Sequence, residues 1–474
     1  MEKNEAMLTY DLTDIGSDSL YQSLYKQIRT DIVKGKLKPG EKLPSKRDFA
    51  AHLGVSVITI ESAYAQLISE GYLYALPKRG FFVSDFKAHL APQEPVLTKE
   101  AAPHPGENAR YFADFSSNQT ESELFPFTIW SKVIRELLSD SRVQLMTNSP
   151  CGGILALRES IARHLRDFRG MSIRPEQIII GAGTEYLYGL LIQLLGNECV
   201  YAIENPGYRK LGNIYSSFHV PCEWIEMDEA GVCIPALEER RADIVHITPS
   251  HQYPTGMVMP ISRRYELMGW AAKKPGRYII EDDYDSELRL SGQPIPTLQS
   301  IDLSGKVIYL NTFTKTLCST VRISYMALPE GLLQAFYDKL SFYSCTVSNF
   351  EQYTLARFIE EGKFEAHINR LRSHYRKKRD ALLDAFKRNR LGKKITLSGE
   401  EAGLHFLMAI RTPIPESEVM KRAQERGIKL LPLSRYYHGQ APRENVYIMN
   451  YSSVDVRWAD EIAGRIYQSA FDAE

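Results

Sequence analysis

The sequence has little cysteine, no excess of charge of either sign and no long uninterrupted apolar run. Its 474 residues include six cysteines, and no two of them form a Cys-x-x-Cys pair. Such scattered cysteines are not a disulfide framework and favour a reducing cytoplasm. Lysine plus arginine and aspartate plus glutamate number 58 each, so net charge provides no general attraction to nucleic acid or membrane. Any nucleic-acid surface must therefore be local.

No stretch predicts a membrane span or an export signal. The first residues, Met-Glu-Lys-Asn-Glu, are charged and lack an apolar core segment, which is unlike a signal peptide. The most apolar long stretch, residues 178–196, contains Glu185, Gln193 and a Gly-Ala-Gly turn. It therefore indicates a strand, a loop and a helix rather than a membrane helix. We expect a cytoplasmic protein with no membrane partner.

Residues 17–86 predict a small winged helix-turn-helix unit. Four aliphatic residues recur at every fourth position and indicate an amphipathic helix: Leu20, Leu24, Ile28 and Ile32. Ser45 and Ser56 are natural N-caps for two further short helices, which a glycine-containing turn joins. The apolar segments 72–75 and 81–83 flank a basic tip and predict a β-hairpin wing.

The charge of this unit favours DNA binding. Eight basic residues between positions 26 and 47 are opposed only by Asp31 and Glu41. The predicted DNA contacts lie at helix starts and at the wing tip: Ser45, Lys46, Arg47, Ser56, Thr59, Lys78 and Arg79. The alternative is a helical interaction module whose lysines only keep it solvated. We favour double-stranded operator DNA, because the basic residues recur where phosphates are contacted.

Proline then divides the chain. Four prolines interrupt residues 87–111, which predict a linker: Pro92, Pro95, Pro103 and Pro105. From residue 112 to 474, strand-like and helix-like segments alternate, which predicts a large α/β domain. Beyond about residue 340 the helices lengthen, and later apolar runs indicate a small α+β subdomain over residues 340–474. We interpret the basic run 370–379 as the solvated face of a long helix.

A lysine at the end of a predicted strand is the main chemical candidate. Lys315 follows the apolar run 307–310, with Thr312 and Thr314 beside it and Arg322 seven residues later. The amine can form a Schiff base with an aldehyde cofactor, while the hydroxyls and the guanidinium hold a phosphate. Pyridoxal 5'-phosphate is the cofactor that needs this combination. The alternative is an exposed lysine in a polar loop.

An acidic strand end supports the same cofactor. Residues 277–287 read Arg-Tyr-Ile-Ile-Glu-Asp-Asp-Tyr-Asp-Ser-Glu, and acids at the carboxyl end of a strand lie where open α/β sheets bind ligands. Asp282 is the candidate partner of the pyridine nitrogen, and Tyr284 that of the ring hydroxyl. The alternatives are a metal site and a solvated acidic turn. A metal is disfavoured because no histidine lies near this cluster in the sequence.

Further segments predict contacts in the same cleft. The turn Gly-Ala-Gly-Thr, residues 181–184, opens an apolar helix, and such a helix start is a seat for phosphate. Tyr208 is placed to stack on a flat ring, although a surface aromatic at a turn is the alternative. Arg435 can grip a carboxylate with two parallel hydrogen bonds or form a structural ion pair.

Both halves of the chain carry recognisable motifs. The first half has Leu-Pro-Ser-Lys-Arg (43–47), Leu-Gly-Val-Ser (53–56) and Glu-Gly-Tyr-Leu (70–73). The second half has Ile-Gly-Ala-Gly-Thr (180–184), Asn-Pro-Gly-Tyr (205–208), Pro-Ser-His-Gln-Tyr-Pro-Thr-Gly (249–256), Glu-Asp-Asp-Tyr-Asp-Ser-Glu (281–287), Phe-Thr-Lys (313–315) and Arg-Ile-Ser-Tyr (322–325). With this combination the chain resembles, over nearly its whole length, the MocR subfamily of GntR-type bacterial regulators, and within it GabR-like proteins.

The resemblance implies an architecture and roles for residues. It implies a winged helix tethered to a fold-type I aminotransferase-like domain, and a domain-swapped homodimer that responds to a small amine or amino-acid effector. Lys315 looks like the catalytic lysine that takes the cofactor, and Lys210 and Arg435 look like effector-binding residues. The implied cofactor-binding residues are Ala182, Gly183, Thr184, Tyr208, Asp282, Tyr284, Thr312, Thr314, Lys315 and Arg322. No metal is implied.

The sequence departs from the family pattern at four places. Val57 stands where many members have an arginine, and Tyr253 stands where aminotransferases have the asparagine of Asn-Pro-Thr-Gly. Lys210 stands where GabR-like proteins bring a second arginine toward the effector carboxylate. Because a lysine is a point charge rather than a fork, the effector need not be γ-aminobutyrate. Segment 317–321 lacks the usual Pro-Gly before the arginine.

Three functions are compatible with these residues. The first is a transcriptional regulator that binds pyridoxal 5'-phosphate on Lys315 and senses γ-aminobutyrate or a related amine. The second is a regulator that senses pyridoxal 5'-phosphate itself to control vitamin B6 synthesis. The third is a working aminotransferase with a DNA-binding appendage. We expect a regulator with at most a partial or slow transaminase reaction, because a winged helix on a long linker would be superfluous in a metabolic enzyme.

Overall fold

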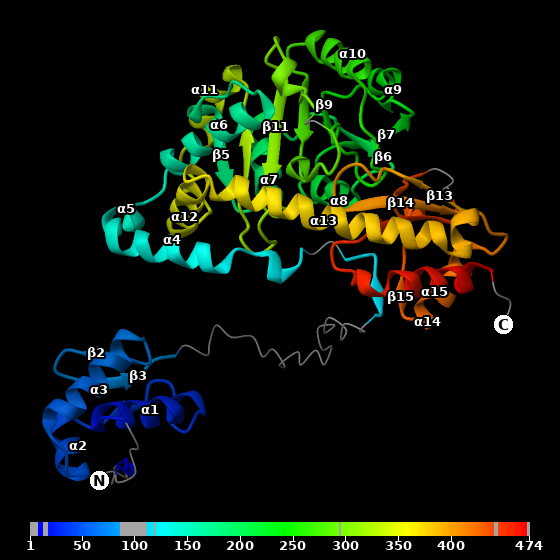
Figure 1. Cartoon of the computed structure of the whole chain (residues 1–474). Helices are drawn as coiled ribbons and strands as arrows, with labels where there is room; N and C mark the ends of the chain where they lie inside the picture. Colours follow the sequence, from blue (N-terminus) through cyan, green and yellow to red (C-terminus); the bar gives the residue numbers. More distant parts are fainter. Residues whose placement is uncertain are drawn as a thin grey trace. The chain divides into compact units, whose positions relative to one another are not determined.

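The chain divides into two compact units, Met1–Glu107 and Asn108–Glu474 (Figure 1). The computed structural model describes residues 8–12, 18–85, 111–117, 120–292, 295–439 and 444–471. Residues 87–110 of the expected linker lie outside this described part.

The first unit is a three-helix module with a small sheet. Its helices are α1 (Leu20–Val33), α2 (Lys46–Leu53) and α3 (Val57–Ser69), and its strands are β1 (Lys42–Leu43), β2 (Leu73–Leu76) and β3 (Gly80–Val83). The strands form an antiparallel sheet in the order β1-β3-β2. Ser45 Oγ accepts a hydrogen bond from the Asp48 amide at 3.2 Å, and Ser56 Oγ accepts one from the Thr59 amide at 3.1 Å. Both predicted caps are therefore confirmed, and the helix period of α1 buries Leu24, Ile28 and Ile32.

An eight-stranded sheet organises the second unit. Its strands are β5 (Ile178–Gly181), β6 (Tyr201–Asn205), β7 (Cys222–Asp228), β8 (Gly231–Val232), β9 (Ile244–Ile247), β10 (Tyr278–Asp282), β11 (Val307–Thr312) and β12 (Ser324–Ala327). Their order is β5-β12-β11-β10-β9-β6-β7-β8. Strands β11, β10, β9, β6 and β7 are mutually parallel, so their carboxyl ends lie along one edge.

Helices cover both faces of this sheet (Figure 1). Helices α7 (Thr184–Leu195), α8 (Arg209–Ser217) and α11 (Glu330–Leu340) pack with Ile280 and Ile308 on one face. Helices α9 (Ile234–Glu239) and α10 (Ile261–Ala272) pack with Ile279 and Val307 on the other, together with α6 (Leu155–Arg169) and α12 (Asn349–Glu360) farther along the sheet. Successive strand residues serve opposite cores, as buried parallel strands require.

The chain continues into a smaller α+β part. The long helix α13 (Lys363–Arg388) leads to an antiparallel sheet of β13 (Ile395–Ser398), β14 (His405–Ile410), β16 (Leu431–Pro432) and β17 (Val446–Asn450), in the order β13-β14-β17-β16. Helices α14 (Glu416–Glu425) and α15 (Ala459–Phe471) complete it, and β15 (Ile428–Lys429) pairs with β4 (Ala113–Asp114). Helices α4 (Phe127–Asp140) and α5 (Arg142–Met146) precede the large sheet.

The basic run on α13 is only partly the solvated face that the sequence predicts, because Arg370, Arg376 and Lys377 are exposed while Lys378 and Arg379 are buried. Arg372 Nε donates to the Glu287 carbonyl at 2.6 Å, and Arg376 Nε donates to the Leu290 carbonyl at 2.8 Å. Lys378 is buried and donates to the Ser452 carbonyl at 2.7 Å. The carbonyls of Glu287 and Leu290 belong to the irregular segment after β10 and that of Ser452 to the segment after β17. Backbone carbonyls outside regular strands need other donors.

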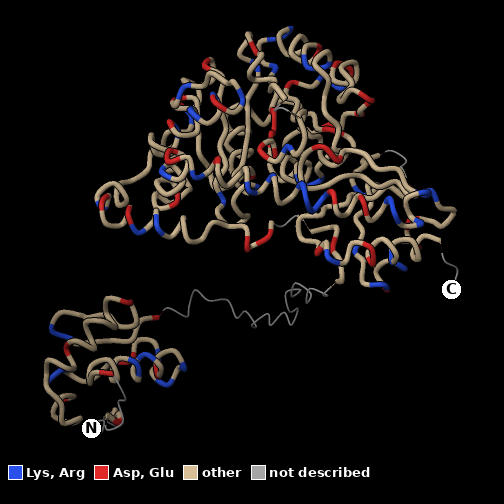
Figure 2. The backbone as a smooth tube through the Cα atoms, in the orientation of Figure 1, with Lys and Arg blue, Asp and Glu red and all other residues tan. Residues whose placement is uncertain are grey.

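Charges of both signs are interspersed over both units (Figure 2). None of the helices in the described part of the chain has both the length and the apolar character that a membrane crossing demands. The six cysteines are all unpaired thiols.

Candidate functional site

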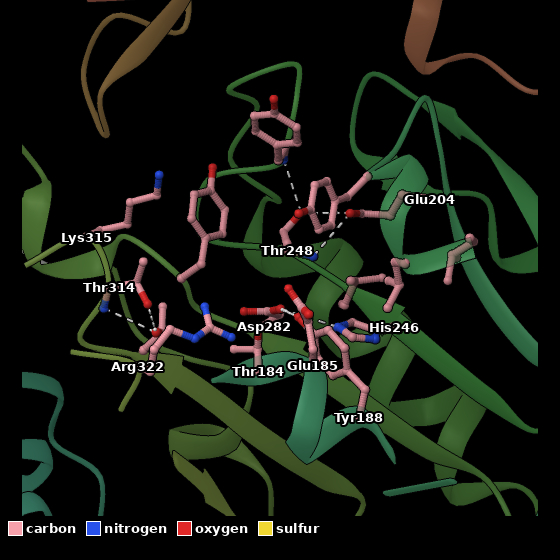
Figure 3. A pocket seen from close by; sticks show the side chains of 17 residues that line it. Thr184, Glu185, Tyr188, Glu204, His246, Thr248, Asp282, Thr314, Lys315 and Arg322 are labelled. Carbon is pink, nitrogen blue, oxygen red and sulfur yellow. Dashed lines mark hydrogen bonds and ion pairs between the residues drawn. The ribbon is translucent and has the colours of Figure 1, made fainter. Parts of the chain in front are cut away.

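A cavity of about 240 Å³ opens at the carboxyl edge of the large sheet (Figure 3). Strands β6, β9, β10 and β11 end at it, and α7 starts at it. Its lining comprises Thr184, Glu185, Tyr188, Ile203, Glu204, Tyr208, Leu211, His246, Ile247, Thr248, Tyr253, Asp282, Tyr284, Thr312, Thr314, Lys315 and Arg322. This is the edge where ligands bind in α/β sheets, and its position follows from the parallel strand order.

Lys315 lies in the turn after β11 and reaches the cavity. Burial lowers the pKa of its amine to about 8, and the nearby Asp285 carboxylate only partly opposes this shift. An ordinary lysine has a pKa near 10.4, so a much larger share of Lys315 is neutral near physiological pH. A neutral amine is the nucleophilic form that attacks a carbonyl.

Asp282 is the last residue of β10, and only one of its two carboxylate oxygens accepts a hydrogen bond from a described residue. Tyr188 Oη donates to Asp282 Oδ2 at 2.5 Å, and His246 Nε2 lies 3.6 Å from the same oxygen. Asp282 Oδ1 is buried and has no hydrogen-bond partner among the described residues. A buried polar atom without a partner is unfavourable, so this oxygen is suited to an N–H donor from a bound group, such as a protonated pyridine ring.

The opposite end of the cavity suits a phosphate. Thr312 Oγ1 and Thr314 Oγ1 lie 2.8 Å apart, and Ser324 Oγ donates to Thr312 Oγ1 at 2.8 Å. The guanidinium of Arg322 contacts the Ala182 carbonyl at 3.5 Å, beside the first turn of α7. Hydroxyls, a fixed cation and a helix N-terminus together form an anion-binding arrangement.

Arg322 and Gly183 lie against each other, and both have a positive φ. Arg322 has a φ of 52° and Gly183 a φ of 94°, both in the left-handed region that residues other than glycine rarely adopt. A Cβ on Gly183 would meet Arg322 Nη2 at 2.2 Å. Glycine is therefore required at this position for the guanidinium to keep its place.

A second buried acid, Glu204, ties two loops together at the cavity. Its Oε2 accepts hydrogen bonds from the Thr248 hydroxyl at 2.7 Å and from Gln252 Nε2 at 3.3 Å. Gln252 also donates to the Pro206 carbonyl at 3.0 Å. Glu204 thus connects the loop that carries Tyr208 with the loop that carries Tyr253. Burial raises the pKa of Glu204 to about 7.

Replacing Glu204 with glutamine is expected to change how stability depends on pH. The folded state raises the carboxyl pKa from 4.5 to about 7, so its stabilising contribution is complete below pH 4.5 and is lost as the pH rises through 7. The free energy of unfolding of Glu204→Gln, relative to that of the wild type, should therefore increase by about 3 kcal/mol between pH 4.5 and pH 8. Denaturant unfolding at both pH values measures this, with the exposed Glu226→Gln as control. An unchanged difference between variant and wild type would contradict the expectation.

Most of the predicted cofactor residues meet in this cavity. Those that line it are Thr184, Tyr208, Asp282, Tyr284, Thr312, Thr314, Lys315 and Arg322. Ala182 and Gly183 are not lining residues, but both lie against the Arg322 guanidinium. Tyr253 lines the cavity where the family pattern has asparagine, and its hydroxyl lies 2.8 Å from that of Tyr436.

The two predicted effector residues do not line the cavity. Lys210 forms an ion pair with Glu185, which raises the pKa of the lysine. Arg435 lies in a 3-10 turn (Leu433–Tyr436) with an exposed side chain, and its carbonyl accepts from Arg209 Nη1 at 3.1 Å. Tyr436 of the same turn contacts Tyr253, so this turn lies at the rim of the cavity.

Sequence reasoning missed Tyr188, Glu204 and His246 as lining residues. No histidine lies near the acidic cluster along the chain, but folding brings His246 and His251 beside it. His246 on β9 pairs with Ile280 on the neighbouring β10, and His251 Nδ1 lies 2.7 Å from Asp285 Oδ2. No group of three or more metal-ligating side chains is arranged to hold an ion within the described residues. Tyr188, one helical turn after Thr184, was the position that the helix period could have indicated.

The predicted DNA contacts gather around α2, α3 and the wing. Arg47, Lys78 and Arg79 are exposed, and Lys78 adopts a φ of 61° at the wing tip. Lys46 Nζ lies 2.6 Å from Glu61 Oε1 on α3. The cap residues Ser45, Ser56 and Thr59 are engaged with one another or with nearby amides, and Ser56 Oγ lies 2.9 Å from Thr59 Oγ1.

Comparison with known proteins assigns both halves. Residues 20–83 match the gntR family of bacterial regulatory proteins, and residues 112–445 match class I and II aminotransferases. The uncharacterised HTH-type regulator YdeL of Bacillus subtilis is 38% identical over 90% of this chain and 92% of its own length. The pyridoxine biosynthesis transcriptional regulator PdxR of Corynebacterium glutamicum is 30% identical over 93% of this chain and 94% of its own length.

Solved structures agree on the fold of the second unit. The kynurenine aminotransferase of Pyrococcus horikoshii superposes with a TM-score of 0.67 at 24% identity, covering 77% of this chain and 91% of its own. The expected fold class, a winged helix plus a fold-type I aminotransferase-like domain, is confirmed. The chain therefore belongs to the gntR family of bacterial regulatory proteins, in the MocR-like branch that joins a helix-turn-helix unit to a class I and II aminotransferase domain.

Proposed function

We propose that this HTH-type regulator binds pyridoxal 5'-phosphate at Lys315 and senses a small amine or amino acid that changes its affinity for operator DNA. In this proposal residues 17–86 bind DNA and residues 87–111 are a linker. Residues 112–474 bind the cofactor and the effector, and a small subdomain begins at about residue 340. Action on DNA places the protein in the bacterial cytoplasm.

One observation carries the proposal. A lysine with a pKa near 8 and a buried aspartate with a free oxygen face the same cavity, whose other end holds two threonine hydroxyls and Arg322. All of these residues belong to the second unit, so the fold of the helix-turn-helix unit does not account for them. Each member matches one polar group of pyridoxal 5'-phosphate: the aldehyde, the ring nitrogen and the phosphate.

The residues have separable tasks in this proposal. When bound, the cofactor supplies an aldehyde and an electron-accepting ring. Lys315 supplies the neutral amine. Asp282 would accept a hydrogen bond from the protonated ring nitrogen, and Tyr188 and His246 orient its carboxylate. Tyr284 is placed for the ring hydroxyl and Tyr208 for stacking. Arg322, Thr312, Thr314 and the first turn of α7, residues 182–184, hold the phosphate.

An effector would bind at the rim of the cavity. Arg435 and Lys210 remain the proposed contacts for its carboxylate, with Arg435 on the turn that Tyr436 anchors to Tyr253. Because Glu185 already pairs with Lys210, an effector must compete with that carboxylate or bind mainly through Arg435. This supports an effector other than the one that an arginine pair would select.

A homodimer is part of the proposal. Two winged helices that read two half-sites gain affinity by linkage. Support comes from Phe127, Val143 and Met146 on α4 and α5, three apolar side chains that stand exposed in the single chain.

Two other functions have specific support. The full-length likeness to PdxR, named for pyridoxine biosynthesis, favours a regulator that senses pyridoxal 5'-phosphate itself to control vitamin B6 synthesis. Lys315 and Asp282 line one cavity, and amine capture and amino transfer use the same two residues, so this site is also compatible with a working aminotransferase. Tyr253 in place of asparagine argues for weak turnover.

An absorbance titration separates these functions. The purified full-length protein is titrated with pyridoxal 5'-phosphate, and the visible band of the lysine-bound cofactor is followed. A panel of amino acids and amines is then added, with operator binding measured in parallel. A lasting spectral shift with one compound, together with altered DNA binding, supports the effector-sensing regulator.

The other outcomes are equally distinct. Repeated turnover of an amino donor and a keto acid supports the aminotransferase. DNA binding that responds to the cofactor and to no amine supports the vitamin sensor. The absence of any cofactor band would contradict all three functions.

A further inference from the structure

The exposed face of the recognition helix lacks any basic side chain. Helix α3 contains no lysine, arginine, histidine or asparagine from Val57 to Ser69. In helix-turn-helix proteins the N-terminal residues of this second helix contact base edges in the major groove. The usual bidentate readers of guanine and adenine, arginine and asparagine, are therefore missing from the position that reads sequence.

The longer polar side chains of α3 and the hydroxyls at its start have partners on the protein, which leaves the short hydroxyls of Ser62 and Ser69. Glu61 pairs with Lys46 at 2.6 Å. Gln66, in the last turns of the helix, donates to Glu70 Oε1 at 3.0 Å. Ser56 and Thr59 form the N-cap. The carboxylate and the amide of α3, and the hydroxyls at its N-terminus, thus have partners on the protein itself.

Aliphatic side chains occupy the first turn instead. Val57 is 43% exposed and Ile58 is 72% exposed, and Ala65 is exposed two turns later. Neighbouring Ile60, Ala63, Tyr64 and Leu67 are buried in the core of the unit. Val57 and Ile58 therefore play no part in that core.

We propose that Val57 and Ile58 read thymine methyl groups in the major groove of the operator. The thymine C5-methyl is the one apolar feature that this groove presents, and aliphatic side chains recognise it by contact. The same unit carries exposed cations, Arg47 on α2 and Lys78 and Arg79 on the wing, which can supply the phosphate contacts that position the helix. This inference rests on the proposed binding of operator DNA and specifies how its sequence is read.

The test removes the methyl group and leaves every base hydrogen bond in place. The full-length protein first selects duplexes from a random library. Each thymine of an enriched duplex is then replaced singly by deoxyuridine, and the Kd is measured. We expect about a fourfold loss at each thymine that is read, the value of burying one methyl group, and no change at the other thymines.

Protein variants locate the contact. Val57→Ala combined with Ile58→Ala should bind thymine and uracil duplexes equally, while weak binding to unrelated DNA stays unchanged because no charge is altered. Val33→Ala removes an aliphatic side chain of similar exposure, 46%, from α1 and should keep the full sensitivity to uracil. Val57→Arg should shift the selected base toward guanine.

Two results would overturn the inference. If an enriched duplex binds as tightly with uracil throughout, methyl groups are not read. If the double alanine variant, shown to be folded by its thermal transition, keeps the sensitivity to uracil, other residues read them. Failure of any duplex to enrich would instead refute the DNA-binding function on which the inference depends.

Discussion

Replacing Lys315 with alanine should abolish the visible absorbance band of bound cofactor at every concentration of pyridoxal 5'-phosphate. Among the described residues no other amine lines the cavity, so we expect no substitute partner for the covalent bond. Lys315→Arg keeps the positive charge and should lose the band equally, because a guanidinium stays protonated and is not a nucleophile. Retention of the band in both variants would mean that another lysine takes the cofactor.

The rate of cofactor capture by the wild type should depend on pH with a midpoint near 8. Burial lowers the pKa of Lys315 to about 8, and only the neutral amine reacts. Below that value the rate should rise about tenfold for each pH unit, and above it the rate should level off. An ordinary lysine would continue to rise to about pH 10. Stopped-flow absorbance between pH 6 and pH 10 distinguishes the two profiles.

Replacing Gly183 with alanine should weaken cofactor binding by roughly tenfold or more. The added Cβ would lie 2.2 Å from Arg322 Nη2, so the guanidinium must shift from the position in which it can hold the phosphate. Loss of one charge-assisted hydrogen bond is worth about 1.5–3 kcal/mol, which corresponds to that change in Kd. Titration of the absorbance band measures it.

Gly196→Ala is the matched control for this variant. Gly196 ends the same helix with a φ of 111°, and its added Cβ would meet only Cys199 Sγ, at 3.8 Å. Both variants carry the backbone strain of a positive φ, worth about 1–2 kcal/mol of stability, but only Gly183→Ala disturbs Arg322. Equal affinity losses in the two variants would show that helix strain, rather than the guanidinium, controls binding.

Local sequence features were sufficient for the first unit. The Ser45 and Ser56 caps and the four-residue period of α1 depend on neighbours within one helical turn, and all of them are confirmed. Strand β1 was not predicted, because two residues show no period. It exists through its pairing with β3, a long-range contact that the local sequence does not reveal.

The basic run on α13 shows that residue type alone does not predict which charged side chains face solvent. Arginine and lysine in a helix usually face solvent, and the sequence offers no sign of the contrary. Lys378 is instead buried and Arg372 half-buried, and both donate to carbonyls of segments that are distant in the chain, as the exposed Arg376 also does. Burial of a cation depends on partners that only folding brings together.

The sequence by itself determined the two-part organisation, and it indicated the proposed reactive lysine and the acidic strand end, because each rests on residues that are close in the chain and on a characteristic spacing. Tertiary structure alone decided that Tyr188 and His246 hold Asp282, that Glu185 pairs with Lys210, and that Arg322 is held against Gly183 in a left-handed conformation. The physical reason is that a parallel sheet brings together strand ends that are tens of residues apart. Charge pairing, burial and pKa depend on distances in space that sequence separation does not fix.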